Sequence, residues 1–267
     1  MIPQLIEQSR KIVIKVGSNT LADKHGHINR AFLAEFAEQI SALLQEGKQI
    51  VLVSSGARIA GISTIGKWER KRDIHYKQAL CAVGQVELME AWRKAFEPHH
   101  IHIGQLLLTA DDFSNDIRTL HMRNTLFTLV DEGVVPIINE NDSVCVDEIK
   151  IGDNDNLAAL SAILWSADLL ILFSDIDGVY TKNPKEHQDA ELIEEVQDLS
   201  ALRASISVGS TNSFGTGGIV TKLEAAEKVL SYGIPMILAH GGKSRVLEAL
   251  RRGTQRGTAF IPAGGKV

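Results

Sequence analysis

The sequence predicts an α/β protein with a mainly parallel central sheet that is covered by helices on both faces. Strand-like apolar runs alternate with helical patterns along the whole chain, which is typical of consecutive β–α–β units. The strand-like runs are continuously apolar, as at 134–138, and such strands are buried on both faces. The length of 267 residues is sufficient to bury a large core.

The expected elements follow one another without an internal repeat or a low-complexity linker. A strand at 12–16 leads into a helix at 31–45, where Phe32, Phe36 and Ile40 recur at helical spacing. The further strands are expected at 50–54, 101–108, 134–138, 169–173 and 236–239, and the further helices near 57 and at 78–96, 121–131, 157–164 and 218–231. We expect one domain, 1–267, with a soft division into 1–165 and 166–267 through which the sheet continues.

Composition excludes several classes of protein. A net charge of −5 lacks the basic excess that nucleic-acid binding favours. Cys81 and Cys145 have no paired spacing, which favours reduced thiols. The N-terminus has no basic segment before a long apolar stretch, and the most apolar stretch, 157–173, is interrupted by two serines and Asp168. We therefore expect a soluble cytoplasmic protein with neither a nucleic-acid nor a membrane partner.

The most informative segment is a cluster of carboxylates and asparagines directly after the strand expected at 134–138. It covers 139–156 and ends where the apolar helix 157–164 begins. Ligands of open α/β sheets bind outside the carboxyl ends of the strands, and converging polar groups are typical of a site. A solvated acidic loop is the alternative. Asparagines that alternate with aspartates beside Gly152 favour the site.

Three glycine-containing segments, 15–18, 54–57 and 213–222, follow strands or open a helix. Glycine lets backbone N–H groups approach phosphate, and a helix N-terminus favours anions. The alternative for each segment alone is that its glycine only forms a tight turn. Lys15 and Lys222 lie in these segments. Two such lysines suit charge stabilisation of a transferred phosphoryl group, although either could be a surface charge.

Other nucleotide and metal signatures are missing. The sequence contains no G-x-x-x-x-G-K-[ST] motif, which excludes a P-loop protein, and no G-x-G-x-x-G after the first strand. The histidine-rich segment 99–102 has no regularly spaced ligand partners, so we interpret it as a surface turn.

Taken in order, these motifs resemble the amino acid kinase family over 12–260. Its shared segments are 15–18, 54–57 and 174–184, and 138–142, 149–156 and 215–222 are more specific to its glutamate-phosphorylating members. The resemblance implies a three-layer αβα sandwich and ATP-dependent phosphorylation of the L-glutamate side-chain carboxylate to L-glutamyl 5-phosphate, the first step of proline biosynthesis. It implies ATP as co-substrate with Mg²⁺, glutamate bound by 1–165 and ATP by 166–267. The resemblance also suggests that proline acts as a feedback inhibitor and that the chain assembles into a homodimer or tetramer.

The resemblance also assigns roles by position. Lys15 and Lys222 would grip the phosphates, and Asp155 would hold both lysines, so these three are the expected catalytic residues. Glutamate binding would fall to Ser55, Asn139, Asp142, Asp153 and Asn154. ATP binding would fall to Lys15, Gly17, Ser174, Asp175, Thr216, Gly217, Gly218, Ile219, Val220, Thr221 and Lys222. No residue is assigned as a metal ligand.

Three features depart from the family pattern. The chain stops after 257–262, where many members continue into a PUA domain, so we expect no PUA domain. Arg58 stands where a small or apolar residue is expected, and Asn183 replaces an aspartate before Pro184. Two alternatives stay open: a kinase of the same family for N-acetylglutamate, aspartate or carbamate, and a catalytically silent sensor on this fold. Such a sensor could dispense with Lys15, Asp155 and Lys222.

Overall fold

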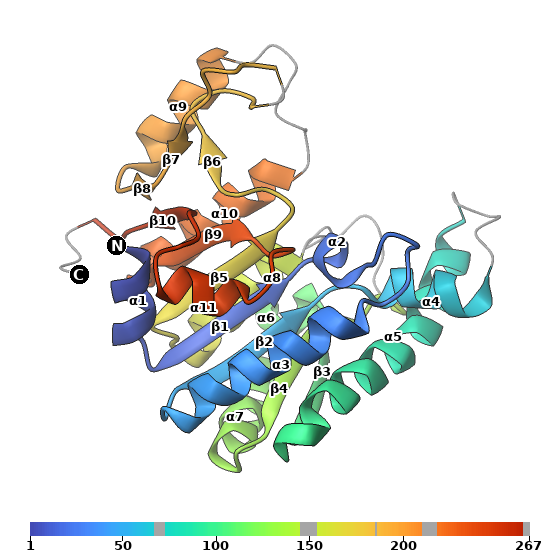
Figure 1. Cartoon of the computed structure of the whole chain (residues 1–267). Helices are drawn as coiled ribbons and strands as arrows, with labels where there is room; N and C mark the ends of the chain where they lie inside the picture. The colour runs from blue at the N-terminus through green and yellow to red at the C-terminus, as the bar shows by residue number, and fades with distance from the viewer. Residues whose placement is uncertain (67–72, 145–153, 185, 210–217, 264–267) are drawn as a thin grey trace.

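The structure is a computed structural model that describes residues 1–66, 73–144, 154–184, 186–209 and 218–263. Within these residues the main sheet has eight strands in the order β3-β4-β2-β1-β5-β9-β10-β8. Every neighbouring pair is parallel except β9 and β10. The prediction of a mainly parallel α/β sheet between helix layers is therefore confirmed (Figure 1).

The strands are short and apolar. They are β1 (Lys11–Val16), β2 (Gln49–Ser54), β3 (Ile103–Leu108), β4 (Val135–Glu140), β5 (Leu169–Ser174), β8 (Glu195–Val196), β9 (Met236–His240) and β10 (Thr258–Phe260). A separate hairpin pairs β6 (Val179–Tyr180) with β7 (Leu192–Ile193). Figure 1 shows this hairpin beside α9, near the β8 end of the main sheet.

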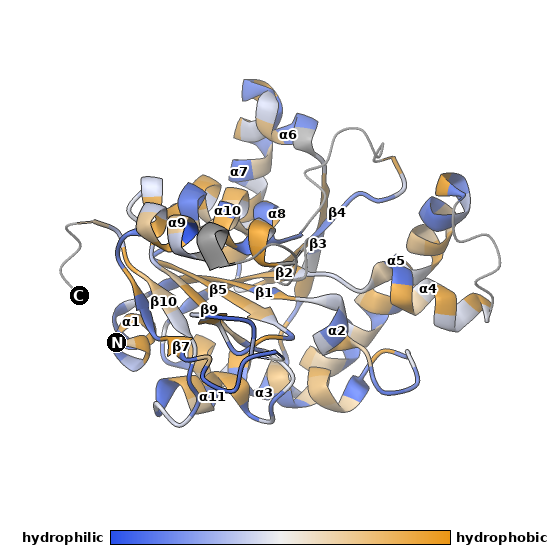
Figure 2. Cartoon of the chain, turned by 90° about the horizontal axis from the view of Figure 1, so that it is seen from above, coloured by the Kyte–Doolittle hydropathy of each residue, from blue (hydrophilic) through white to orange (hydrophobic). Residues whose placement is uncertain are grey.

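The helices form two layers, each with its own apolar core against one face of the sheet. One layer contains α1 (Ile2–Gln8), α2 (Ser18–Leu21), α3 (Arg30–Gln45), α4 (Ala57–Ile65), α5 (Ile74–Phe96) and α11 (Val246–Arg251). The other contains α7 (Asp116–Asp131), α8 (Asn154–Trp165), α9 (Leu199–Gly209) and α10 (Gly218–Ser231). Short connecting helices are η1 (Glu97–His99) and α6 (Ala110–Ser114). Figure 2 shows the hydrophobic strands between these two layers.

Strand β1 decides which side chains reach each layer. Ile12 and Ile14 belong to the core under α3 and α5, and Val13 belongs to the core under α8 and α10. Because side chains alternate along a strand, Lys15 shares the face of Val13. Its ammonium group is therefore directed toward α8 and α10.

The first and second halves of the chain share this sheet, since β1 pairs with β2 on one side and with β5 on the other. Strand β4 continues through Glu140, so Asn139 lies inside the strand and not after it as expected. Backbone pairing with β3 as far as Glu140 explains the longer strand. None of the described helices is both long and apolar enough to cross a membrane.

Candidate active site

Three predicted residues from distant parts of the sequence meet at the carboxyl edge of the sheet. Asp155, in the first turn of α8, is completely buried. Lys15 Nζ, from β1, lies 2.5 Å from its Oδ1, and Lys222 Nζ, from α10, lies 3.0 Å from its Oδ2. The two lysines are only 5% and 6% exposed. A single carboxylate therefore holds two buried ammonium groups.

The charges of this trio support one another. Burial alone would raise the pKa of Asp155, but the ammonium groups of Lys15 and Lys222 outweigh it, and the pKa is lowered below its usual value. Thr221 Oγ1 adds a hydrogen bond to Asp155 Oδ2 at 3.2 Å. Asp155 is therefore a carboxylate at neutral pH, and the trio has an excess of one positive charge.

The end of β5 places a second carboxylate near this trio. Asp175 accepts hydrogen bonds from Asn19 Nδ2 at 3.0 Å and from Ser174 Oγ at 3.1 Å. Partial burial raises the pKa of Asp175. The hydrogen bonds from Asn19 and Ser174 and the charge of Lys222 together lower it by more, so the net pKa lies below the usual value. The structure thus brings the predicted residues Ser174 and Asp175 toward Lys222.

Gly17 leaves room between the first strand and β5. A Cβ atom added there would lie 3.4 Å from Lys15 Nζ and from the Phe173 carbonyl oxygen, so any larger side chain would crowd the lysine. Of the remaining predicted ATP-binding residues, Gly218 starts α10. Ile219 is buried and Val220 is half-exposed. Thr216 and Gly217 lie outside the described residues and stay predictions.

Three predicted glutamate-binding residues, from the turn after β2, from β4 and from the start of α8, are joined by hydrogen bonds. Asn154 Nδ2 donates to Ser55 Oγ at 2.7 Å and to Asn139 Oδ1 at 3.0 Å. Asn139 Oδ1 also accepts the Glu140 backbone N–H at 2.9 Å. A fourth predicted residue, Asp142, lies two residues after the end of β4 at Glu140. The fifth predicted residue, Asp153, lies outside the described residues and stays a prediction.

Asp142 has a distinct electrostatic environment. Burial is the main cause that raises its pKa, and the charge of Glu140 adds to it, while the Cys81 thiol and Arg58 act in the opposite direction. The same contact affects Cys81, whose pKa burial and Asp142 raise to about 12. Asp142 is thus a carboxylate with limited charge compensation, suited to receive a cation.

Comparison with known proteins identifies the family of this chain. Residues 10–240 match the amino acid kinase family. The chain belongs to that family. It is 64% identical over 260 residues to a glutamate 5-kinase of Alkaliphilus metalliredigens, and the alignment covers 97% of this chain and 98% of that relative. It is 47% identical to a glutamate 5-kinase of Treponema pallidum, and the alignment covers 98% of this chain and 99% of that relative. A longer glutamate 5-kinase from a Geobacter species is 42% identical, with 71% of its length covered.

Two solved structures share the fold at low sequence identity. The UMP kinase of Ureaplasma parvum superimposes with a TM-score of 0.67 at 17% identity, covering 95% of this chain and 99% of that one. An isopentenyl phosphate kinase superimposes with a TM-score of 0.62 at 19% identity, covering 94% and 99%. Both likenesses concern the arrangement of the sheet and helices.

In this amino acid kinase, α4, which begins two residues after Ser55, is in close backbone contact with α5. A Cβ atom at Gly84 would lie 1.8 Å from the Ala57 carbonyl oxygen, and one at Gly61 would lie 1.9 Å from the Leu80 carbonyl oxygen. Only glycine allows so close an approach. The two helices are thereby fixed against each other, with Cys81 on the buried side of α5.

Sequence reasoning missed three residues of the site. Gln85 accepts a hydrogen bond from Asn139 Nδ2 at 2.8 Å, Cys81 contacts Asp142, and Asn19 holds Asp175. A polar residue on the apolar face of the helix expected at 78–96 was the available signal for Gln85, because buried polar groups require partners. The pairing of Asn19 with Asp175 has no comparable signal, since the two are far apart in sequence.

Proposed function

We propose that this amino acid kinase transfers the γ-phosphoryl group of ATP to the side-chain carboxylate of L-glutamate. The product would be L-glutamyl 5-phosphate, the first intermediate of proline biosynthesis. The observation that carries the proposal is the pair of buried ammonium groups, Lys15 and Lys222, on the single carboxylate of Asp155. High identity to glutamate 5-kinases over nearly their full length supports the choice of substrate.

The arrangement fits the demands of phosphoryl transfer to a carboxylate. The glutamate side chain is already ionised at pH 7, so the reaction needs no general base. Rate enhancement must then come from alignment and from positive charge on the transferring group. Lys15 and Lys222 supply that charge, and Asp155 holds both ammonium groups in place before ATP binds. Preorganised charges of this kind need little rearrangement during the reaction.

Glutamate would bind at the ends of β2 and β4. Its α-ammonium needs acceptors, because burying an unpaired cation is costly, and the carboxylate of Asp142 and the side-chain oxygen of Asn154 are acceptors. Ser55 accepts from Asn154, which leaves its own hydroxyl hydrogen for a carboxylate of the substrate. The side-chain carboxylate of glutamate would then extend toward Lys15.

ATP would bind between the end of β5 and the start of α10. Residues 218–222 and the pair Ser174 and Asp175 surround this position, and the N-terminus of α10 favours phosphate oxygens. Gly17 keeps the space beside Lys15 free of a side chain. The positive excess of the trio favours phosphate on the same side.

Mg²⁺ is proposed to enter with ATP. Among the described residues, no group of three His, Cys, Asp or Glu side chains could hold a metal ion. Both carboxylate oxygens of Asp155 already receive ammonium groups. Mg²⁺ commonly retains several waters and relies on substrate phosphates. The site therefore fits a magnesium ion that the phosphates of ATP carry and whose charge would offset theirs.

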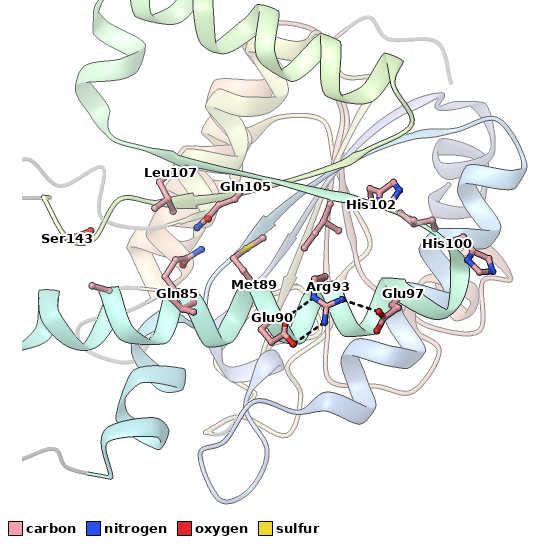
Figure 3. Close-up of a pocket in the computed structure, with 14 residues that line it drawn as sticks. Gln85, Met89, Glu90, Arg93, Glu97, His100, His102, Gln105, Leu107 and Ser143 are labelled. Atoms are coloured by element: carbon pink, nitrogen blue, oxygen red, sulfur yellow. Dashed lines mark hydrogen bonds and ion pairs between the residues drawn. The ribbon is translucent and has the colours of Figure 1, made fainter.

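The remaining partner proposals concern location, assembly and regulation. We propose a cytoplasmic enzyme that forms a homodimer or tetramer and is inhibited by proline as the end product of its pathway. Strand β3 is the sheet edge and pairs only with β4 among the described strands. A groove of about 900 Å³ separates it from α5 (Figure 3), and Val86 beside it is 70% exposed. This surface supports self-association, which sedimentation with and without proline would test.

The alternatives differ in the substrate that they require. N-acetylglutamate lacks the α-ammonium and would leave the acidic pocket around Asp142 uncompensated. Aspartate is one methylene shorter, so its carboxylate would stop more than about 1 Å short of the phosphoryl group and lose alignment. A silent sensor would not require the Lys15, Asp155 and Lys222 trio.

Trapping of the acyl phosphate tests the proposal. The chain is incubated with ATP, Mg²⁺ and hydroxylamine, and hydroxamate is measured with L-glutamate, L-aspartate and N-acetyl-L-glutamate. We expect hydroxamate with L-glutamate and very little with the other two. Comparable rates with N-acetylglutamate would refute both the substrate and the role of Asp142.

A further inference from the structure

A chain of side-chain hydrogen bonds joins helix α5 to the candidate glutamate site. Asn139 Nδ2 donates to Gln85 Oε1 at 2.8 Å, and Asn154 Nδ2 donates to Asn139 Oδ1 at 3.0 Å. Asn154 Nδ2 also donates to Ser55 Oγ at 2.7 Å. The four residues come from α5, β4, α8 and the turn after β2. Gln85 is thereby linked to Ser55 through two amides.

One backbone group fixes the direction of every bond in this chain. The Glu140 N–H can only donate, and it donates to Asn139 Oδ1 at 2.9 Å. The oxygen of Asn139 is therefore identified by its partner, and its nitrogen must face Gln85. Gln85 must present its oxygen in return, and Asn154 must present its nitrogen to Asn139. The orientation of these amides thus follows from bonding and not from arbitrary choice.

The fixed direction leaves two free ends. Among the described residues, neither Gln85 Nε2 nor Asn154 Oδ1 has a hydrogen-bond partner, and both atoms are buried. Buried polar groups without partners are rare in folded proteins and call for an explanation, which a bound ligand can supply. Asn154 Oδ1 is therefore a buried acceptor beside Ser55 and Asn139 that could receive a donor group of a ligand. Gln85 itself is 9% exposed, and Figure 3 shows its side chain directed from α5 toward β3.

We propose that Gln85 is a positioning residue for the amino-acid substrate, because it accepts from Asn139 and so keeps the Asn154 oxygen facing the substrate's α-ammonium. This inference rests on the proposed function. Without an acceptor at position 85, Asn139 Nδ2 loses its partner, and the Asn139 amide is free to rotate. Asn154 would then lose its fixed orientation, although Gln85 is expected to make no contact with ATP.

Two substitutions separate positioning from general stability. Gln85→Leu removes the acceptor, whereas Gln85→Glu keeps an acceptor oxygen at the same reach. Gln39→Leu is the matched control, because Gln39 is also buried and also accepts hydrogen bonds, from the Leu247 and Glu248 backbone N–H groups of α11, in the layer away from the trio. The measurements are KM for L-glutamate, KM for ATP, kcat and the melting temperature.

We expect Gln85→Leu to raise KM for L-glutamate about tenfold or more, as for one buried polar group left without its partner, with KM for ATP unchanged. Gln85→Glu should recover most of the affinity, and Gln39→Leu should lower only the melting temperature. Equal effects of Leu and Glu at position 85, or a parallel rise of both KM values, would overturn the inference. A wild-type chain that forms no glutamyl hydroxamate would instead refute the proposed function.

Discussion

The ammonium group of Lys15 lies 2.5 Å from Oδ1 of Asp155, which leaves the second oxygen of that carboxylate for Lys222 at 3.0 Å. Both oxygens of Asp155 are thus in contact with an ammonium group. Both lysines are largely buried, and the carboxylate gives each of them a partner of opposite charge. The unbalanced positive charge is available for phosphate.

Replacing Lys222 should impair the chemical step more than ATP binding. We expect Lys222→Met to lower kcat about a hundredfold or more, the range for loss of one preorganised charge. Lys228→Met, in the same helix, is the control, because its ammonium donates to Asn156 and not to Asp155. Steady-state kinetics checks this. A wild-type kcat with only a raised KM for ATP would contradict the assignment.

Replacing Asp155 should cost both activity and stability. Asp155→Asn leaves two buried ammonium groups without a counter-charge, and breaking a buried pair costs about 3–5 kcal/mol. The folded-state pKa of Asp155 lies below the ordinary value of 3.8, so its stabilisation is complete above that pH and is lost only as the pH falls through the folded pKa. Urea unfolding at pH 7 therefore measures the whole effect. Unchanged stability would contradict the buried trio.

The affinity for glutamate should depend on the protonation of Asp142. Its pKa is raised, mainly by burial, so it takes up a proton at a higher pH than an ordinary aspartate does. A protonated Asp142 cannot attract the α-ammonium, so KM for L-glutamate should rise as the pH falls toward that range. Asp142→Asn should have a high KM with a flatter pH profile over the same range. Identical pH profiles for the two proteins would separate Asp142 from substrate binding.

Gly84 offers a prediction that opposes helix propensity. Within a helix, Gly→Ala ordinarily stabilises by about 1 kcal/mol. Here the added Cβ would lie 1.8 Å from the Ala57 carbonyl oxygen, so Gly84→Ala should destabilise by at least about 1–3 kcal/mol as α4 and α5 separate. Lys94→Ala, at an exposed position of the same helix with only a surface ion pair to Glu90, should change little. Thermal unfolding of both variants decides it, and a more stable Gly84→Ala would contradict the packing.

The sequence predicted the parts of the site that lie at strand ends. Alternating strands and helices require the carboxyl ends of β1, β2, β4 and β5 to share one edge, so Lys15, Ser55, Asn139 and Ser174 were expected to lie near one another. The family motifs supplied the pairing of Asp155 with both lysines. These expectations rest on local pattern and on resemblance, and both can be read along the chain.

Contacts that depend on packing between layers could not be predicted. Lys48 is a buried lysine whose ammonium donates to the Ile6, Glu7 and Ser9 carbonyl oxygens at 2.9 Å, at the C-terminal end of α1. No local pattern distinguishes it from a surface lysine. The direction of Gln85 likewise depends on the rotation of α5, which the close contact at Gly84 sets.

The most direct test of the central claim follows an oxygen atom. L-Glutamate with both side-chain carboxylate oxygens replaced by ¹⁸O is incubated with the chain, ATP, Mg²⁺ and hydroxylamine. If the carboxylate attacks the γ-phosphorus, one ¹⁸O becomes the bridging oxygen, and hydroxylamine attack at the carbonyl carbon releases it with phosphate while the other stays in the hydroxamate. We predict that the glutamate-dependent phosphate carries one ¹⁸O by mass spectrometry. Glutamate-dependent phosphate without ¹⁸O would show that the carboxylate is not the acceptor.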